Sequence, residues 1–208
     1  MKNKIYRYPN FTPSLGNLTS KFRKEYIDEQ IKLNLLPKNS FENEQIMSLV
    51  ASTDINDKVY FWQLYSIIGQ DPLHILIKTF YENIFNDESS RIEWFKNGFS
   101  EIGDVNYHVK GQKNFWLDVM GGGKLYIGGE SRLSFKHRMV QDMMNTKGAE
   151  LWMNYMKITL NEVKFHFMHD SRIIPCIDSF LNFFMKKYSF EFDFNIYSLL
   201  HDKSLSKL

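Results

Sequence analysis

The long stretch without proline is the feature that most restricts how this chain of 208 residues can fold. The chain has five prolines, but none lies between Leu73 and Ile174. Because proline breaks helix interiors, such a stretch permits long helices. Apolar residues in it recur at steps of three and four, as on one face of a helix; examples are Leu73, Leu76, Ile77, Phe80, Tyr81 and Ile84, and later Leu151, Trp152, Tyr155, Met156, Leu160 and Val163. Strand-like alternation is weak, so the sequence predicts an all-α domain.

The same spacing locates the individual helices. It predicts helices over residues 57–70, 71–87, 105–120, 149–168 and 174–192, with a loop or short helix over 89–104. Asp71 followed by Pro72 is typical of an N-cap and a first helical position. Short connections between these helices indicate one compact bundle.

The composition divides the chain into three segments. Residues 1–57 are rich in Asn, Lys, Glu and Ser and contain one helical candidate over 19–36, so we expect a partly disordered or helical extension. Residues 58–194 carry the predicted helices and form the expected domain, and residues 195–208 form a C-terminal tail.

Charge and cysteine usage restrict the class of protein. The formal net charge of +2 is too small to indicate a nucleic-acid partner, which requires a clustered basic face. Cys176 is the single cysteine and cannot form an intramolecular disulfide, which favours a reducing compartment. No signal-peptide pattern and no apolar run of membrane-spanning length occurs. We therefore expect an intracellular, cytoplasmic protein without a membrane partner.

The glycine-rich segment "GGGKLYIGG" invites a phosphate-binding interpretation. A P-loop requires a glycine, four residues and then Gly-Lys-Ser/Thr. Here Lys124 is followed by Leu125, and Asp118 stands where the first glycine belongs. The segment is better explained as a connection between two helices.

Two of the six histidines have surroundings that favour a binding role. His108 and Gln112 lie four residues apart, hence on one helix face, and His137 follows Leu133 by four. Imidazole is the usual protein ligand of haem iron. A buried, hydrogen-bonded histidine is nevertheless a commoner finding than a ligand, so both interpretations stay open at this point.

The other histidine pair gives a weaker signal. His166 and His169 lie three residues apart, but no third ligand follows at zinc-site spacing. Two exposed helical histidines are the simpler interpretation. No HExxH motif is present either.

Five motifs together resemble a known family. "TFYENIFND", "WFKNGF", "FWLDVMGGGKLY", "RLSFKH" and "AELWMNYM" occur in the order and approximate spacing of truncated haemoglobins, and are most similar to the plant-like members of their second group. The tryptophan 15 positions after His137 adds to the match, which spans residues 59–192. The resemblance implies a two-on-two helical sandwich around haem b.

The resemblance also implies roles for individual residues. His137 matches the proximal iron ligand. The distal, ligand-facing set would be Tyr81, His108, Gln112 and Trp152. The residues that contact haem would be Phe95, Phe99, Phe115, Tyr126, Leu133, Lys136 and Met156, with Lys136 beside a propionate.

The chain departs from the family at two places. "GGGKLY" stands where Gly-Gly-Pro commonly precedes Leu-Tyr, and the stretch between His137 and Trp152 is longer than usual. His108 beside Trp152 is also similar to the third group. The local geometry around the proximal histidine is therefore expected to differ from the family pattern.

The implied function is binding of oxygen, nitric oxide or carbon monoxide at a His-ligated haem. Several distal hydrogen bonds, each worth about 1.5–3 kcal/mol, would slow oxygen release. Slow release favours oxygen or nitric-oxide chemistry, such as nitric-oxide dioxygenase or peroxidase-like activity, or sensing, over simple transport. A reductase partner and a homodimer stay open. The alternative is a haem-free helical interaction module that retains the globin fold.

Overall fold

The computed structural model describes residues 64–120 and 129–196 without a break. It also describes Tyr126 and parts of the first 61 residues, namely 5–7, 24, 25, 28, 31, 32, 50–52, 56, 59 and 61. The glycines predicted to connect two helices, Gly121–Gly123, lie outside the described residues, as do 197–208 of the predicted tail.

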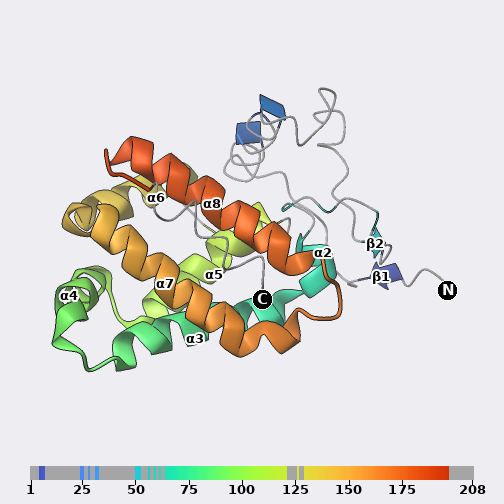
Figure 1. The fold of residues 1–208 in the computed structure, drawn as a ribbon, viewed down its shortest axis with the longest axis horizontal. Coiled ribbons are helices and arrows are strands. Elements are labelled where there is room, and N and C mark those ends of the chain that lie inside the picture. Colours follow the sequence, from blue (N-terminus) through green and yellow to red (C-terminus); the bar gives the residue numbers. More distant parts are fainter. Residues whose placement is uncertain are drawn as a thin grey trace.

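The described domain is a bundle of α-helices, as the sequence predicts. Figure 1 shows the order along the chain, which is α2 (Leu64–Ile68), α3 (Gln70–Asn86), α4 (Glu93–Ile102), α5 (Val105–Val119), α6 (Gly129–Met139), α7 (Thr146–Val163) and α8 (Ile173–Glu191). Short 3-10 turns over Ser90–Ile92, Gln141–Met143 and Lys164–His166 complete it. The first of these leads into α4, the second joins α6 to α7, and the third follows α7. The predicted all-α class is confirmed.

Capping residues explain where two of the helices begin. The side chain of Asp104 accepts a hydrogen bond from the Tyr107 N–H at the start of α5, and Asn145 accepts one from the Gly148 N–H at the start of α7. Both satisfy donors that a helix leaves unpaired at its first turn.

The start of α3 differs from the prediction. Its N-cap is Gly69, whose φ of 73° is left-handed, and not Asp71. Glycine adopts this conformation without steric cost, so the helix begins earlier than the Asp71-Pro72 pair indicates. Asp71 then lies in the first turn, where a carboxylate interacts favourably with the helix dipole.

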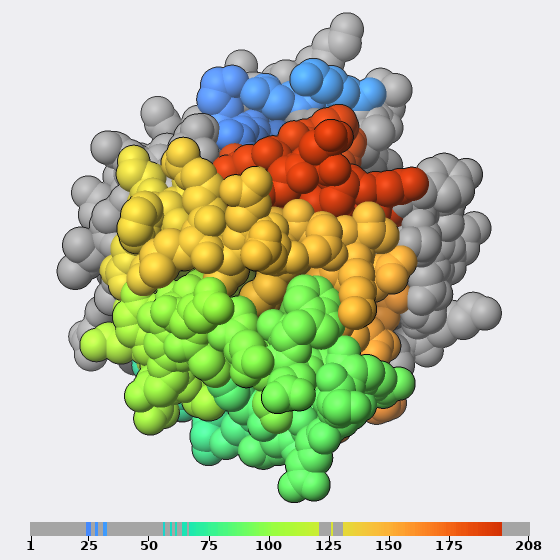
Figure 2. Space-filling model, turned by 90° about the vertical axis from the view of Figure 1, so that its left-hand side faces the viewer, coloured from blue at the N-terminus to red at the C-terminus, as the bar shows by residue number. Residues whose placement is uncertain are grey.

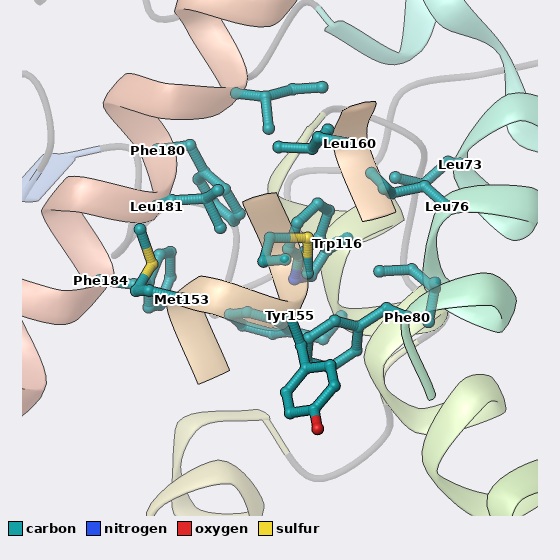
Figure 3. Packing of buried hydrophobic residues seen from close by; sticks show 14 of the residues in the cluster. Leu73, Leu76, Phe80, Trp116, Met153, Tyr155, Leu160, Phe180, Leu181 and Phe184 are labelled. Carbon is teal, nitrogen blue, oxygen red and sulfur yellow. The ribbon is translucent and has the colours of Figure 1, made fainter. Parts of the chain in front are cut away.

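A large apolar core holds the helices together. α3 packs extensively against α5 and α7. Trp116 of α5 meets Phe180 of α8 with ring centroids 5.2 Å apart, and Phe180 meets Phe184 at 4.7 Å. Figure 3 shows these rings beside Met153 and Leu160 of α7. Each fully buried side chain of this kind stabilises the fold by about 1.5–3 kcal/mol.

Part of the extension also contacts the domain. A short antiparallel pair, β1 (Ile5–Arg7) and β2 (Val50–Ser52), which the sequence did not predict, lies against α2. Helical residues occur among 24–32, inside the helix predicted over 19–36. Glu25 forms an ion pair of 2.6 Å with Lys187 of α8. Among the described residues, no helix combines the length and apolar character needed to cross a membrane.

Candidate functional site

A cavity lies between the helices, and six of them contribute to its wall. Its volume is about 170 Å³. Figure 2 shows the face where the green segment with α4 and the start of α5 meets the yellow and gold segment with α6 and the start of α7. Both segments contribute to a lining that is mostly apolar.

Among the described histidines, His137 is the one that lines the cavity. Burial lowers the pKa of its imidazole to about 4, and the Leu133 carbonyl one turn earlier offsets this only in part. Nδ1 of His137 is buried and has no hydrogen-bond partner among the described residues. The Tyr188 ring lies 4.4 Å from the imidazole, centroid to centroid. The imidazole is therefore neutral at physiological pH, with a lone pair available to a metal.

Tyr81 and Gln112 form a polar pair in the same cavity. The Tyr81 hydroxyl donates to Oε1 of Gln112 at 2.6 Å. Burial raises the pKa of Tyr81 far above its usual range, so this hydroxyl stays protonated. Nε2 of Gln112 is buried and has no partner among the described residues. The amide of Gln112 thus retains N–H groups that a bound molecule could accept from.

Trp152 lines the cavity as well, whereas His108 does not. The Trp152 ring packs against Phe80 with centroids 5.0 Å apart. Nε2 of His108 lies 2.8 Å from the Phe99 carbonyl, which can only accept, so that nitrogen carries the hydrogen. Burial lowers the pKa of His108 and keeps it neutral. His108 thus ties α5 to α4 in this structure.

The seven residues expected to contact haem divide into two groups. Phe95, Phe99, Phe115 and Leu133 line the cavity, and Tyr126, Lys136 and Met156 do not. Nζ of Lys136 lies over the Tyr107 ring, 4.9 Å from its centroid. The Tyr126 N–H donates to the buried carboxylate of Asp118 at 2.9 Å, and Met156 is fully buried in the core.

The structure adds lining residues that the sequence analysis missed. One set follows His137 along the chain, and another lies on α8; they are Val140, Met143, Met144, Asn145, Gly148 and Ala149, and Phe180, Leu181, Phe184, Met185 and Tyr188. The spacing of four between Phe180, Phe184 and Tyr188 marks a single helix face. This spacing could have identified the α8 lining residues from the sequence, because the face that carries them points toward the cavity.

The remaining histidine pair does not form a site. His169 contacts the Ile67 carbonyl through Nε2 at 3.2 Å, whereas the His166 ring lies against Phe165 with centroids 4.0 Å apart. Over the part of the chain that the structure describes, no group of three His, Cys, Asp or Glu side chains could hold a metal ion.

Comparison with known proteins gives one match. The model of a family described as bacterial-like globin matches residues 63–185, which is more than half of the chain. No curated protein and no solved structure matches the chain significantly. The matched range contains α2 to α7 and most of α8, and with them nearly all of the cavity lining.

Proposed function

Because the chain belongs to the bacterial-like globin family, we propose that it binds haem b in this cavity through His137 and takes up oxygen or another diatomic gas there. Membership of the family indicates haem-based binding of diatomic gases in general. The observation that carries the finer assignment is that the imidazole of His137, with its Nδ1 atom buried, lines the same cavity as the Tyr81–Gln112 pair.

The donor set of the cavity fits a haem group. A porphyrin is flat and apolar, and aromatic and aliphatic side chains dominate the wall. A neutral imidazole is the protein ligand that haem iron most often takes. The cavity of about 170 Å³ is smaller than the ~300–1,000 Å³ usual for ligand pockets. Its walls would therefore have to move apart to admit the group.

His137 would supply the proximal bond. When bound, haem would supply an iron centre that takes up the gas. Ligating histidines usually direct their second ring nitrogen to a carbonyl, which fixes the tautomer. The Leu133 carbonyl is the group placed for this role on α6. Nδ1 would then hold the proton, and Nε2 would be the coordinating nitrogen.

Gln112, Tyr81 and Trp152 would act on the gas. The Tyr81 hydroxyl is engaged with Oε1 of Gln112, so it fixes the amide with its N–H groups available. We infer that Gln112 donates directly to the ligand, with the Trp152 indole N–H as a second donor. A hydrogen bond to a partial negative charge contributes about 1.5–3 kcal/mol. Two such bonds would slow release and favour oxygen or nitric-oxide chemistry, or sensing, over transport.

Lys136 and Arg132 would bind the propionates of haem. Interactions with Lys136 first, and also with Arg132, lower the pKa of the Tyr107 hydroxyl against the opposing effect of burial. Both cations therefore lie at the same place on the edge of α6. Two cations side by side suit a group with two carboxylates.

The proposed domain runs from residue 58 to residue 194, with residues 1–57 as an extension and 195–208 as a tail. Its support is that the family match and the cavity lining fall inside this domain range. A reductase would have to return electrons to the haem if the protein performs turnover chemistry.

Absorbance spectroscopy tests the proposal. The full chain, purified and mixed with one equivalent of haem, should give a Soret band and, after reduction, a shifted band with carbon monoxide. Free haem in the same buffer is the control. A spectrum equal to that of free haem would contradict the proposal and favour a haem-free helical interaction module.

A further inference from the structure

The segment after His137 turns sharply before α7 begins. We call residues 140–145 the proximal turn. Backbone hydrogen bonds connect its two ends, since the Val140 N–H donates to the His137 carbonyl at 3.2 Å, the Met143 N–H to the Val140 carbonyl at 2.8 Å and the Asn145 N–H to the Met143 carbonyl at 2.9 Å. A displacement at one end of so short a turn must therefore reach its other end.

Two glycines enclose this turn. A Cβ atom at Gly148 of α7 would come within 1.9 Å of the Met143 carbonyl oxygen. A Cβ atom at Gly98 of α4 would come within 1.7 Å of the Met143 sulfur. With Met143 in this position, neither glycine has room for a side chain. The two contacts differ in kind, because one is with rigid backbone and the other with a flexible side chain.

The turn joins three parts of the cavity wall. Met143 itself lines the cavity, as do His137 before it and Gly148 after it. The Met143 side chain contacts α4, the helix that carries Phe95 and Phe99. The Met143 carbonyl contacts α7, the helix that carries Trp152.

We propose that Gly98, Met143 and Gly148 are positioning residues that fix His137 relative to the α4 and α7 walls of the cavity. The inference rests on the proposed function, in which His137 binds haem iron. Close-packed interiors resist local expansion, so a methyl group at position 148 must move the turn. Because the turn begins at the His137 carbonyl, the imidazole would move with it. The longer stretch between His137 and Trp152 is the part of the chain that forms this turn.

The test compares three alanine variants of the haem-loaded full chain. Gly148→Ala and Gly98→Ala enlarge the two enclosing glycines. Gly111→Ala is the matched control, because a Cβ atom there meets nothing within 4 Å. The readouts are the iron–histidine stretching band in the ferrous protein and the rate of haem loss to a haem-scavenging protein. We expect Gly148→Ala to shift the band and speed haem loss by roughly tenfold or more. Gly98→Ala should have a smaller effect, and Gly111→Ala none.

A second pair of variants separates the two contacts. Met143→Ala removes the sulfur that Gly98→Ala would strike, so the double variant should regain the band position of Met143→Ala alone. The same change cannot rescue Gly148→Ala, because the Met143 carbonyl remains. Ile84→Val, a change at a buried residue outside the cavity lining, checks that a loss of stability alone leaves the band in place.

The outcomes are separable. If haem binds but Gly148→Ala and Gly98→Ala match Gly111→Ala in both readouts, the positioning role is wrong and the proposed function stands. If Gly148→Ala does not fold, Gly98→Ala and its rescue by Met143→Ala decide the question. A wild-type chain without a Soret band would overturn both the proposed function and this inference.

Discussion

The two sides of the cavity are built differently. Tyr81 and Gln112 come from α3 and α5, two long helices that pack extensively on each other in the core. His137 comes from α6, which makes no comparably extensive helix contact among the described residues. Two large side chains on α6, Phe135 and Met139, are 59% and 44% exposed. The polar pair is thus fixed by the core itself, and the histidine by a few local contacts.

Contacts at three places hold the histidine side of the cavity. They are the Tyr188 ring against the imidazole, the proximal turn, and the Asp118 carboxylate that accepts from the Tyr126 N–H before α6 begins. A single hydrogen bond contributes about 1 kcal/mol net. We therefore expect changes around α6 to alter haem retention, and changes on α3 and α5 to alter gas kinetics.

His137→Ala should have the largest effect. No other histidine in the described part of the chain lines the cavity, so removal of this imidazole should abolish the protein–iron bond. We expect most haem to be lost on desalting, with partial recovery in the presence of added imidazole. The pyridine haemochrome assay measures bound haem. Normal haem content with an unchanged ferrous spectrum would contradict the assignment.

Tyr81→Phe and Trp152→Phe test the opposite side. Each should speed oxygen release about tenfold, since one loses the hydroxyl that orients Gln112 and the other loses an indole donor. Haem retention should stay at the wild-type level. Stopped-flow displacement of oxygen by carbon monoxide measures the rate.

His108→Ala is the control for these variants, because His108 lies outside the cavity lining and bonds to the Phe99 carbonyl. It should change oxygen release less than either. A ferrous spectrum with the sharp split bands of bis-histidine haem, abolished by His108→Ala, would contradict this placement.

Asp118→Ala should have an intermediate effect on the histidine side. Its loss leaves the Tyr126 N–H unpaired and loosens the connection into α6, so haem loss should be about fivefold faster. Asp118→Asn keeps an acceptor oxygen and should restore part of the rate. Asp104→Ala is the matched control at the other end of α5. It should lower the free energy of unfolding by about 1 kcal/mol without changing haem loss.

Deletion of residues 1–57 should have the smallest effect. None of the described residues in this segment lines the cavity, although Glu25 pairs with Lys187 and Ile31 packs against the core. We expect an unchanged Soret band and a modest fall in melting temperature. Failure of the truncated chain to hold haem would show that the extension belongs to the domain.

The helices were predictable from the sequence because their signals are local. Apolar residues at steps of three and four place α3, α7 and α8, and the absence of proline allows their length. The same spacing does not predict the residue at which α3 begins, because Gly69 takes a left-handed conformation that no spacing rule detects.

The candidate site was predictable only where a motif carried it. The motifs pointed to His137, Tyr81, Gln112 and Trp152, which the structure brings into one cavity. They also pointed to His108, which instead bonds to the Phe99 carbonyl. Helical spacing placed His108 and Gln112 on one face of α5, but it could not tell which of them lines the cavity.

By itself, then, the sequence determined the all-α class, the approximate positions of α3, α5, α7 and α8 and a set of candidate ligands, because each of these depends on residues within a few turns of one another. The tertiary structure alone decided which polar groups pair across the cavity, which face of α8 lines it, and why Gly98 and Gly148 must lack side chains. Those features depend on atoms brought together from distant parts of the chain, where close packing, and not local spacing, sets the distances.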